Sequence, residues 1–153
     1  MGLKTIKKKR RFKTMSRLAD ILITGAEKSD KEKKVVFSSR YKNADGSPVE
    51  ATITQMTSRQ NNNYRKQATK HTKKGKESDF DHGEYMNFIL LNHVKDPDFS
   101  KQEDITKAGV NTPEDYIDKV LNAGEVDNLV MEIMDFSGIN ESLDDIKKEV
   151  KKP

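Results

Sequence analysis

Apolar residues recur along this chain of 153 residues at two different spacings, which predict where helices and strands lie. In residues 15–23 the apolar positions share one helical face, and Gly25 then marks the end of a short amphipathic helix. That face consists of Leu18, Ile21 and Leu22. Residues 26–34 are almost entirely charged or small, so they are predicted to form a flexible linker.

A short amphipathic helix on a flexible tether is a candidate for binding a partner. A helix of this length is marginally stable in water unless its apolar face docks on a surface. Two surfaces meet that need equally well: a partner protein, or the chain's own domain.

The spacing then changes to the period of two that is typical of strands. Residues 35–41 and 49–56 are rich in β-branched and aromatic residues, and residues 43–48 between them are rich in turn formers. They predict a hairpin with one apolar face. The face carries Val35, Phe37, Tyr41, Val49, Ala51 and Ile53. A lone hairpin is unstable in water, so helices are expected to cover it.

The rest of the chain has helical spacing, interrupted by a polar loop at residues 71–80. Helices are predicted at about residues 57–70, 83–94, 100–109, 112–121 and 124–138, with a last one from about Glu141. The predicted fold class is α+β. An N-terminal β-hairpin packs on a bundle of about four to six short helices in a single domain, residues 35–153, behind a flexible basic N-terminus.

Local capping patterns support three of these helix starts. Thr57-Ser-Arg-Gln60 and Ser100-Lys-Gln-Glu103 both match a capping box. Thr112 precedes Pro113 and two acids, the order expected for an N-cap residue, a first helical position and a first turn. The helix at 83–94 is apolar on nearly all sides, which predicts the most buried element.

Charge is distributed unevenly along the chain. Residues 1–14 hold seven basic side chains and no acid, although the whole chain has a net charge of only +4. Residues 1–97 sum to +11 and residues 98–153 to −7. Such a division is typical either of two solvated surfaces of opposite sign or of a molecule that associates head to tail.

Enzymatic chemistry is not expected. The chain has no Cys, and no motif supplies a nucleophile with its base, a phosphate loop or a zinc-binding helix. The acids of residues 79–84 lack the spacing of a calcium loop. No catalytic residue, metal site or cofactor is therefore predicted, and no apolar run is long enough to span a membrane.

Nucleic-acid binding is the alternative that the composition raises. A basic tract follows the second predicted strand, and residues 1–14 add a basic arm. The tract comprises Arg59, Arg65, Lys66, Lys70, Lys73, Lys74 and Lys76, with Tyr64 as its one aromatic. Stacking platforms are scarce, since the chain has no Trp and most of its Phe and Tyr occupy core-like positions. Nucleic acid is therefore the less favoured partner.

Residues 15–153 resemble the tail assembly chaperones of PBSX-like bacteriophages, the XkdN-like family. The matching pieces, in order, are Met15-Ser-Arg-Leu-Ala-Asp-Ile-Leu22, Val36-Phe-Ser-Ser-Arg-Tyr-Lys42, Asp45-Gly-Ser-Pro-Val49, Thr54-Gln-Met-Thr57, Tyr64-Arg-Lys66, Asp96-Pro-Asp98, Leu121-Asn-Ala-Gly-Glu-Val126 and Met134-Asp-Phe-Ser-Gly-Ile139. The chain departs from the family at the polar run Gln60–Asn63 and in its basic leader, residues 1–14. Because the resemblance begins at Met15, the native protein is expected to start there.

The resemblance implies a non-enzymatic role in building a phage or prophage tail. Chaperones of this kind are thought to keep the tape measure protein soluble in the host bacterial cytoplasm while tube subunits polymerise around it, and to leave before the virion is complete. The implied partner is the tape measure protein. The tail tube protein and a second copy of the chain are further candidates.

The residues expected to contact a partner lie on three predicted helices. They are Leu18, Ile21, Leu22, Arg59, Tyr64, Arg65, Met131, Met134 and Phe136. Methionine adapts to apolar ligands of different shape, although packing in the core is the alternative role for Met131 and Met134.

Overall fold

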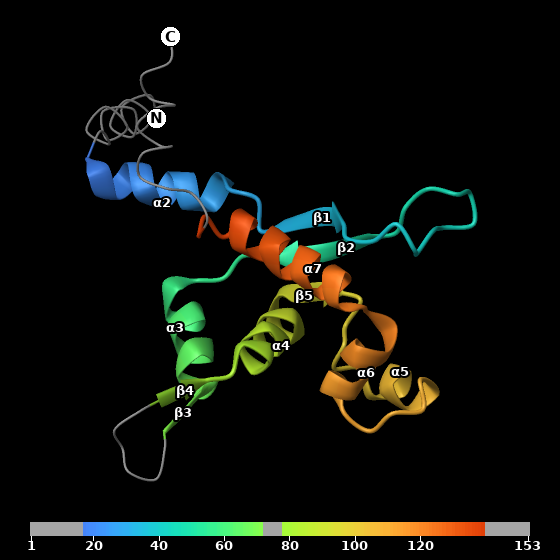
Figure 1. The fold of residues 1–153 in the computed structure, drawn as a ribbon. Coiled ribbons are helices and arrows are strands. Elements are labelled where there is room, and N and C mark those ends of the chain that lie inside the picture. Colours follow the sequence, from blue (N-terminus) through green and yellow to red (C-terminus); the bar gives the residue numbers. More distant parts are fainter. Residues whose placement is uncertain (1–16, 72–77, 140–153) are drawn as a thin grey trace. The chain divides into compact units, whose positions relative to one another are not determined.

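The computed structural model describes residues 17–71 and 78–139 and divides the chain into two units, one ending at Lys31 and one beginning at Glu32 (Figure 1). The predicted leader and the last predicted helix, from about Glu141, lie outside the described residues. Within them the fold has six helices and a small antiparallel sheet, so the predicted α+β class is confirmed.

The described part of the first unit, residues 17–31, contains helix α2, Leu18–Lys28. It runs past Gly25, where the sequence predicted its end, and is closed at Ser29, whose backbone N–H bonds to the Gly25 carbonyl. A single glycine costs a helix only about 1 kcal/mol, and good helix formers follow it here. The predicted linker therefore begins later than expected.

The second unit begins with a three-stranded sheet in the order β1-β2-β5. Strand β1, Glu32–Val36, pairs with β2, Glu50–Thr54, and places Val35 opposite Ala51. Buried side chains alternate along both strands as predicted: Val35, Ala51 and Ile53 are buried.

Two parts of the sheet differ from the sequence prediction. β1 starts three residues early, inside the predicted linker, because a charged strand is well suited to an exposed sheet edge. Its Lys33 and Glu32 pair with Glu132 and Lys95. The third strand, β5, Val94–Asp96, was not predicted. It follows α4 directly and pairs with β2.

Two short strands border the loop predicted at residues 71–80. The first replaces the end of the helix predicted at 57–70, which stops at Gln67, and the second lies inside the predicted loop. β3, Thr69–His71, pairs antiparallel with β4, Ser78–Phe80. Both have only three residues, too few for periodicity to reveal.

The helices of the second unit begin largely where the caps predicted. The capping box of α3, Ser58–Gln67, is present, with Thr57 Oγ1 accepting from Gln60 N at 3.2 Å. Thr112 caps α6, Pro113–Val120, by accepting from Asp115 N at 3.1 Å. The box predicted at residues 100–103 is wrong. Helix α5, Gln102–Lys107, starts after Lys101 with no side-chain cap, while Ser100 N bonds to Asp98.

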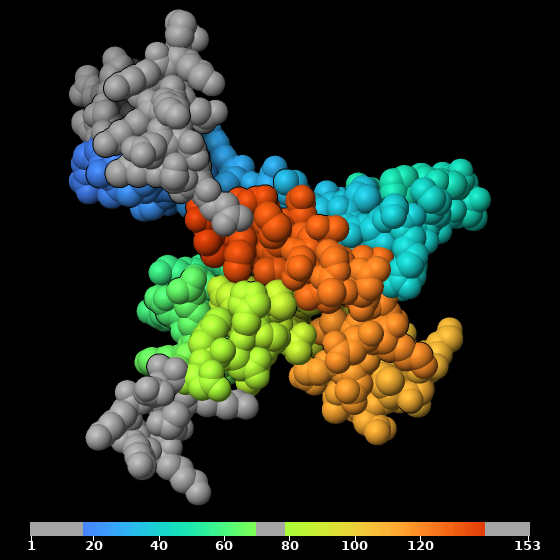
Figure 2. All heavy atoms as spheres, in the orientation of Figure 1, coloured from blue at the N-terminus to red at the C-terminus, as the bar shows by residue number. Residues whose placement is uncertain are grey.

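The core lies between the sheet and two long helices. α4, His82–His93, packs against α7, Ala123–Phe136, and α7 contacts β1 and β2 (Figures 1 and 2). Ile53, Ile89, Leu90, Leu129 and Ile133 are fully buried there. The helices thus cover the apolar face of the hairpin as predicted.

Candidate partner-binding surfaces

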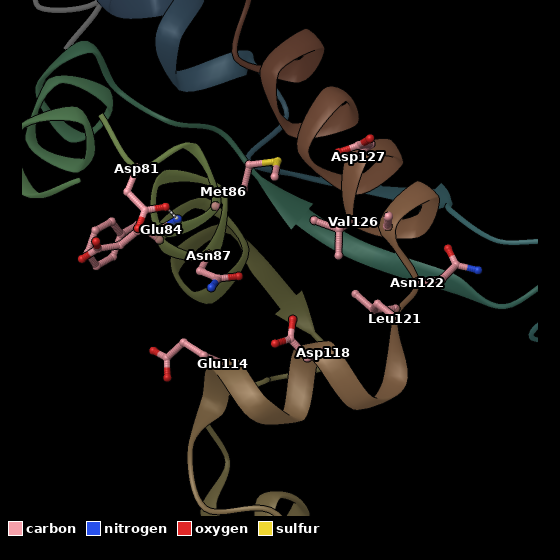
Figure 3. A pocket seen from close by; sticks show the side chains of 13 residues that line it. Asp81, Glu84, Met86, Asn87, Glu114, Asp118, Leu121, Asn122, Val126 and Asp127 are labelled. Carbon is pink, nitrogen blue, oxygen red and sulfur yellow. Dashed lines mark hydrogen bonds between the residues drawn. The ribbon is translucent and has the colours of Figure 1, made fainter. Parts of the chain in front are cut away.

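An open groove of about 910 Å³ lies where α4, α6 and the start of α7 meet (Figure 3). Its apolar lining comes from Met86 and Phe88 of α4, Val126 of α7, and Leu121 between α6 and α7. Met86, Phe88 and Val126 are each half-buried against the core. The groove is therefore bounded by the packed domain, and its apolar side chains remain within reach of solvent.

The charged residues that line this groove are all acidic. They are Asp81, Glu84, Glu114, Asp118 and Asp127. Asp81 accepts from the backbone N–H of Glu84 and so caps α4. Among the described residues, the carboxylates of the other four have no ion-pair or hydrogen-bond partner. The groove thus offers unpaired negative charge around an apolar floor.

A second surface, on helix α3, is basic where the groove is acidic. Arg59, Arg65 and Lys66 line a shallow hollow of about 920 Å³ together with polar residues. Arg65 stacks over the ring of Tyr85, with its guanidinium carbon 5.7 Å from the ring centroid. Arg59 and Arg65 are exposed, as a partner-binding role requires.

Tyr64, the third residue predicted on this helix, points the other way. Only 7% of its surface is exposed, and its hydroxyl lies 2.9 Å from Nε2 of His93, whose Nδ1 lies 3.2 Å from Thr54 Oγ1. The ring also stacks with Phe88. In this structure Tyr64 is a core residue that joins α3 to α4, so the proposed partner surface omits it. The basic surface of α3 consequently lacks the aromatic that base stacking would use.

The buried histidine predicts a pH dependence of folding. Burial lowers the pKa of His93, and a backbone hydrogen bond at Gln55 opposes this in part. Because the folded pKa lies below the unfolded value of about 6.5, the stabilisation is present above pH 6.5 and declines as the pH falls below it. Urea midpoints measured between pH 7.5 and 5.5 should fall with acidification, and less steeply in His93→Gln. Equal slopes for the two proteins would contradict this, and exposed His82→Gln is the matched control.

The candidate residues of α7 divide between surface and core. Met131 is 56% exposed, whereas Met134 and Phe136 are partly buried and pack against the core. Met131 alone of the three presents most of its side chain to solvent. The core role considered for Met134 is therefore the one that its packing supports.

The candidate residues of α2 are all exposed. Leu18, Ile21 and Leu22 expose 69%, 55% and 61% of their surfaces, and α2 contains no buried residue. An apolar helix face of this kind is a common feature of helix-in-groove recognition.

The candidate surfaces on the described residues are the exposed apolar face of α2, the acidic groove and the basic hollow on α3. Among residues 17–71 and 78–139, no three His, Asp or Glu side chains are placed to hold a metal ion. In the same ranges, no helix has the length and apolar character needed to cross a membrane.

Comparison with known proteins identifies the family. Residues 18–151 match the family of phage XkdN-like tail assembly chaperones. The chain belongs to this family. A tail assembly chaperone of this family binds phage tail proteins.

The fold of this chaperone is also found in a solved structure. The crystal structure of the protein yqbn superposes with a TM-score of 0.56 at 16% identity, over 73% of this chain and 90% of that one. At so low an identity the similarity shows the fold alone. No curated protein matches the chain.

The groove is the part of the chaperone's surface that sequence reasoning missed. Its residues come from three helices that the core brings together. One signal was present in the sequence, because Glu114 and Asp118 are four residues apart and so share a face of α6. Nothing in the sequence placed that face against Met86 and Val126.

Proposed function

We propose that this tail assembly chaperone binds the tape measure protein of its phage and keeps it soluble in the host cytoplasm while the tail tube forms. The chaperone then leaves before the virion is complete. The role is one of binding, without catalysis. Tail tube subunits are a second candidate partner, since they assemble around the same client.

The exposed apolar face of α2 is the observation that carries this proposal. A helix of 11 residues that buries none of them has little to stabilise it in isolation. An apolar client supplies the missing surface. The resemblance to tail chaperones implies that the tape measure protein is long and prone to aggregate, so it would offer apolar surface of this kind to the chaperone.

Two other surfaces support the same role. Arg59 and Arg65 on α3 would attract acidic segments of a client, and Met131 on α7 would adapt to apolar ones. Contacts spread over several elements suit a chaperone, which has to bind many segments weakly and then release them. The proposed contacts therefore comprise Leu18, Ile21, Leu22, Arg59, Arg65 and Met131, with the partly buried Met134 and Phe136 reached only if α7 shifts.

Co-expression tests the proposal. The tape measure protein from the same locus is produced alone and together with the chaperone, and its soluble fraction is measured after centrifugation. The expected result is a rise of several-fold in soluble tape measure protein with both proteins in one complex. An unrelated aggregation-prone helical protein serves as control and should not be rescued. An insoluble tape measure protein in both cultures would contradict the proposal.

The purified chaperone also tests the alternative of nucleic-acid binding. A chain that binds DNA through Arg59, Arg65 and Lys66 should do so with a steep dependence on salt. We expect no DNA binding at physiological ionic strength.

A further inference from the structure

The groove between α4, α6 and α7 combines two features that the fold itself does not use. Its floor leaves Met86, Phe88 and Val126 half-buried at the surface. Its rim carries carboxylates that lack a cation among the described residues. Each feature has a small cost, because apolar surface stays in contact with water and like charges repel one another.

Helix capping explains only part of the rim. Asp81 caps α4, and Glu84 and Glu114 lie in first helical turns, where an acid is favourable. Asp118 lies near the C-terminus of α6, where the helix dipole disfavours an anion. In Figure 3 its side chain projects from α6 toward α4, across the groove. The helix that carries Asp118 gains nothing from this charge.

The size and shape of the groove indicate what it would hold. An open hollow of about 910 Å³ is far larger than an ion needs and accepts several apolar side chains. Four of its five carboxylates are exposed, whereas its apolar residues Met86, Phe88 and Val126 are half-buried. A complementary ligand therefore has an apolar stripe flanked by cations, which is the pattern of a basic amphipathic helix.

We propose that this groove binds a basic amphipathic helix of a client protein, with the apolar face on Met86, Phe88 and Val126 and with Lys or Arg beside the carboxylates. The inference deepens the proposed function and rests on it for the identity of the client, because it gives the chemistry of one segment that the client presents. The attraction is local, since the chain as a whole has a net charge of +4 and repels cations at long range.

Synthetic peptides test the groove directly on the full-length chain. The probe is a fluorescein-labelled amphipathic peptide of Leu, Ala and Lys, about 18 residues long so that it forms a helix on binding. One comparison peptide has Glu in place of each Lys, and another has the same composition in a scrambled order. Fluorescence anisotropy should show binding of the basic amphipathic peptide alone, weakening as salt is raised from 50 to 300 mM. Equal binding of the acidic or the scrambled peptide would overturn the inference.

Charge-neutral variants locate the site. Asp118→Asn with Asp127→Asn removes two charges from the rim and should weaken peptide binding by about threefold to tenfold. Glu103→Gln with Asp115→Asn removes two exposed charges, on α5 and α6, from residues that do not line the groove, and it should change the affinity less than twofold. All four side chains are exposed, so the variants are expected to fold. Equal losses in the two pairs would mean that only overall charge matters, and the inference would fail.

A second copy of the chain is the other occupant that charge permits, because α3 carries Arg59, Arg65 and Lys66. If sedimentation velocity shows self-association that Asp118→Asn with Asp127→Asn abolishes, and excess unlabelled chain displaces the peptide, a second copy fills the groove and the inference is wrong. The peptide experiments and the tape measure co-expression have separate readouts. A failure of one therefore leaves the other interpretable.

Discussion

Glu125→Ala is expected to lower the free energy of unfolding by about 2–4 kcal/mol. Only 4% of this residue is exposed. Its carboxylate accepts from Ser38 Oγ, from Arg40 Nη2 at 2.6 Å and from the backbone N–H of Asn122 at 2.8 Å. The side chain thus completes the capping box of α7 and anchors the hairpin to it. Urea denaturation followed by circular dichroism measures the change. Removing the carboxylate frees all three donors at once, although half-exposed Arg40 can turn to water.

The matched control is Glu132→Ala on the same helix. Glu132 is partly exposed and its Oε2 lies 3.9 Å from Lys33 Nζ, so its loss should cost less than about 0.5 kcal/mol. A second test measures the free energy of unfolding as a function of pH. The hydrogen bonds from Arg40 and then Ser38 lower the pKa of Glu125 from 4.5 to about 2. Its stabilisation is therefore complete above pH 4.5 and declines as the pH falls toward 2. Glu125→Gln should lose stability less steeply than the native chain in that range, and a similar slope would contradict the anchor.

Local signals in the sequence predicted the features that depend on neighbouring residues. The caps at Thr57 and Thr112 and the alternation of Val35, Ala51 and Ile53 need only a few residues of chain, and the structure confirms them. The turn between the strands is also local, with Gly46 at φ 87° where few other residues fit.

Features that depend on distant partners were missed. Strand β5 has three residues and exists because β2 offers an edge about 40 residues earlier in the chain. The first strand ends at Val36 and not at Tyr41, since Ser38 and Arg40 bond to Glu125 of α7. Contacts between residues so far apart in the chain cannot be predicted from the spacing of apolar residues.

The candidate surfaces could likewise be predicted where they depend on neighbouring residues, and not where they depend on distant ones. Exposure of Leu18, Ile21 and Leu22 agrees with a helix that the sequence described as amphipathic. Tyr64 was expected to contact a partner, but its hydroxyl lies beside His93, 29 residues away, in the core. The acidic groove required the placement of three helices and had no equivalent in the sequence.

Substituting the apolar face of α2 is expected to have the largest effect on function. Leu18→Gln, Ile21→Gln and Leu22→Gln together should reduce co-purification of the tape measure protein at least tenfold. Full burial of each side chain against a client contributes about 1.5–3 kcal/mol, and tenfold corresponds to about 1.4 kcal/mol. Glutamine keeps the helix propensity of the segment, so the change falls on the apolar surface.

A control on the same helix separates surface chemistry from helix loss. Asp20→Gln, Glu27→Gln and Lys28→Gln alter the polar positions of α2 and should leave co-purification within twofold. Thermal unfolding of the apolar variant supplies the second control. An unchanged midpoint supports a face reserved for a partner, whereas a lower midpoint would mean that the face docks on the chain's own domain.

The central claim is tested most directly by capturing the tape measure protein on an affinity tag from cells that also produce this chain. The account predicts that the native chain elutes with the soluble tape measure protein, and that the variant with Gln at positions 18, 21 and 22 does not. Recovery of soluble tape measure protein without the chain, or equal recovery of the native chain and the variant, would contradict it.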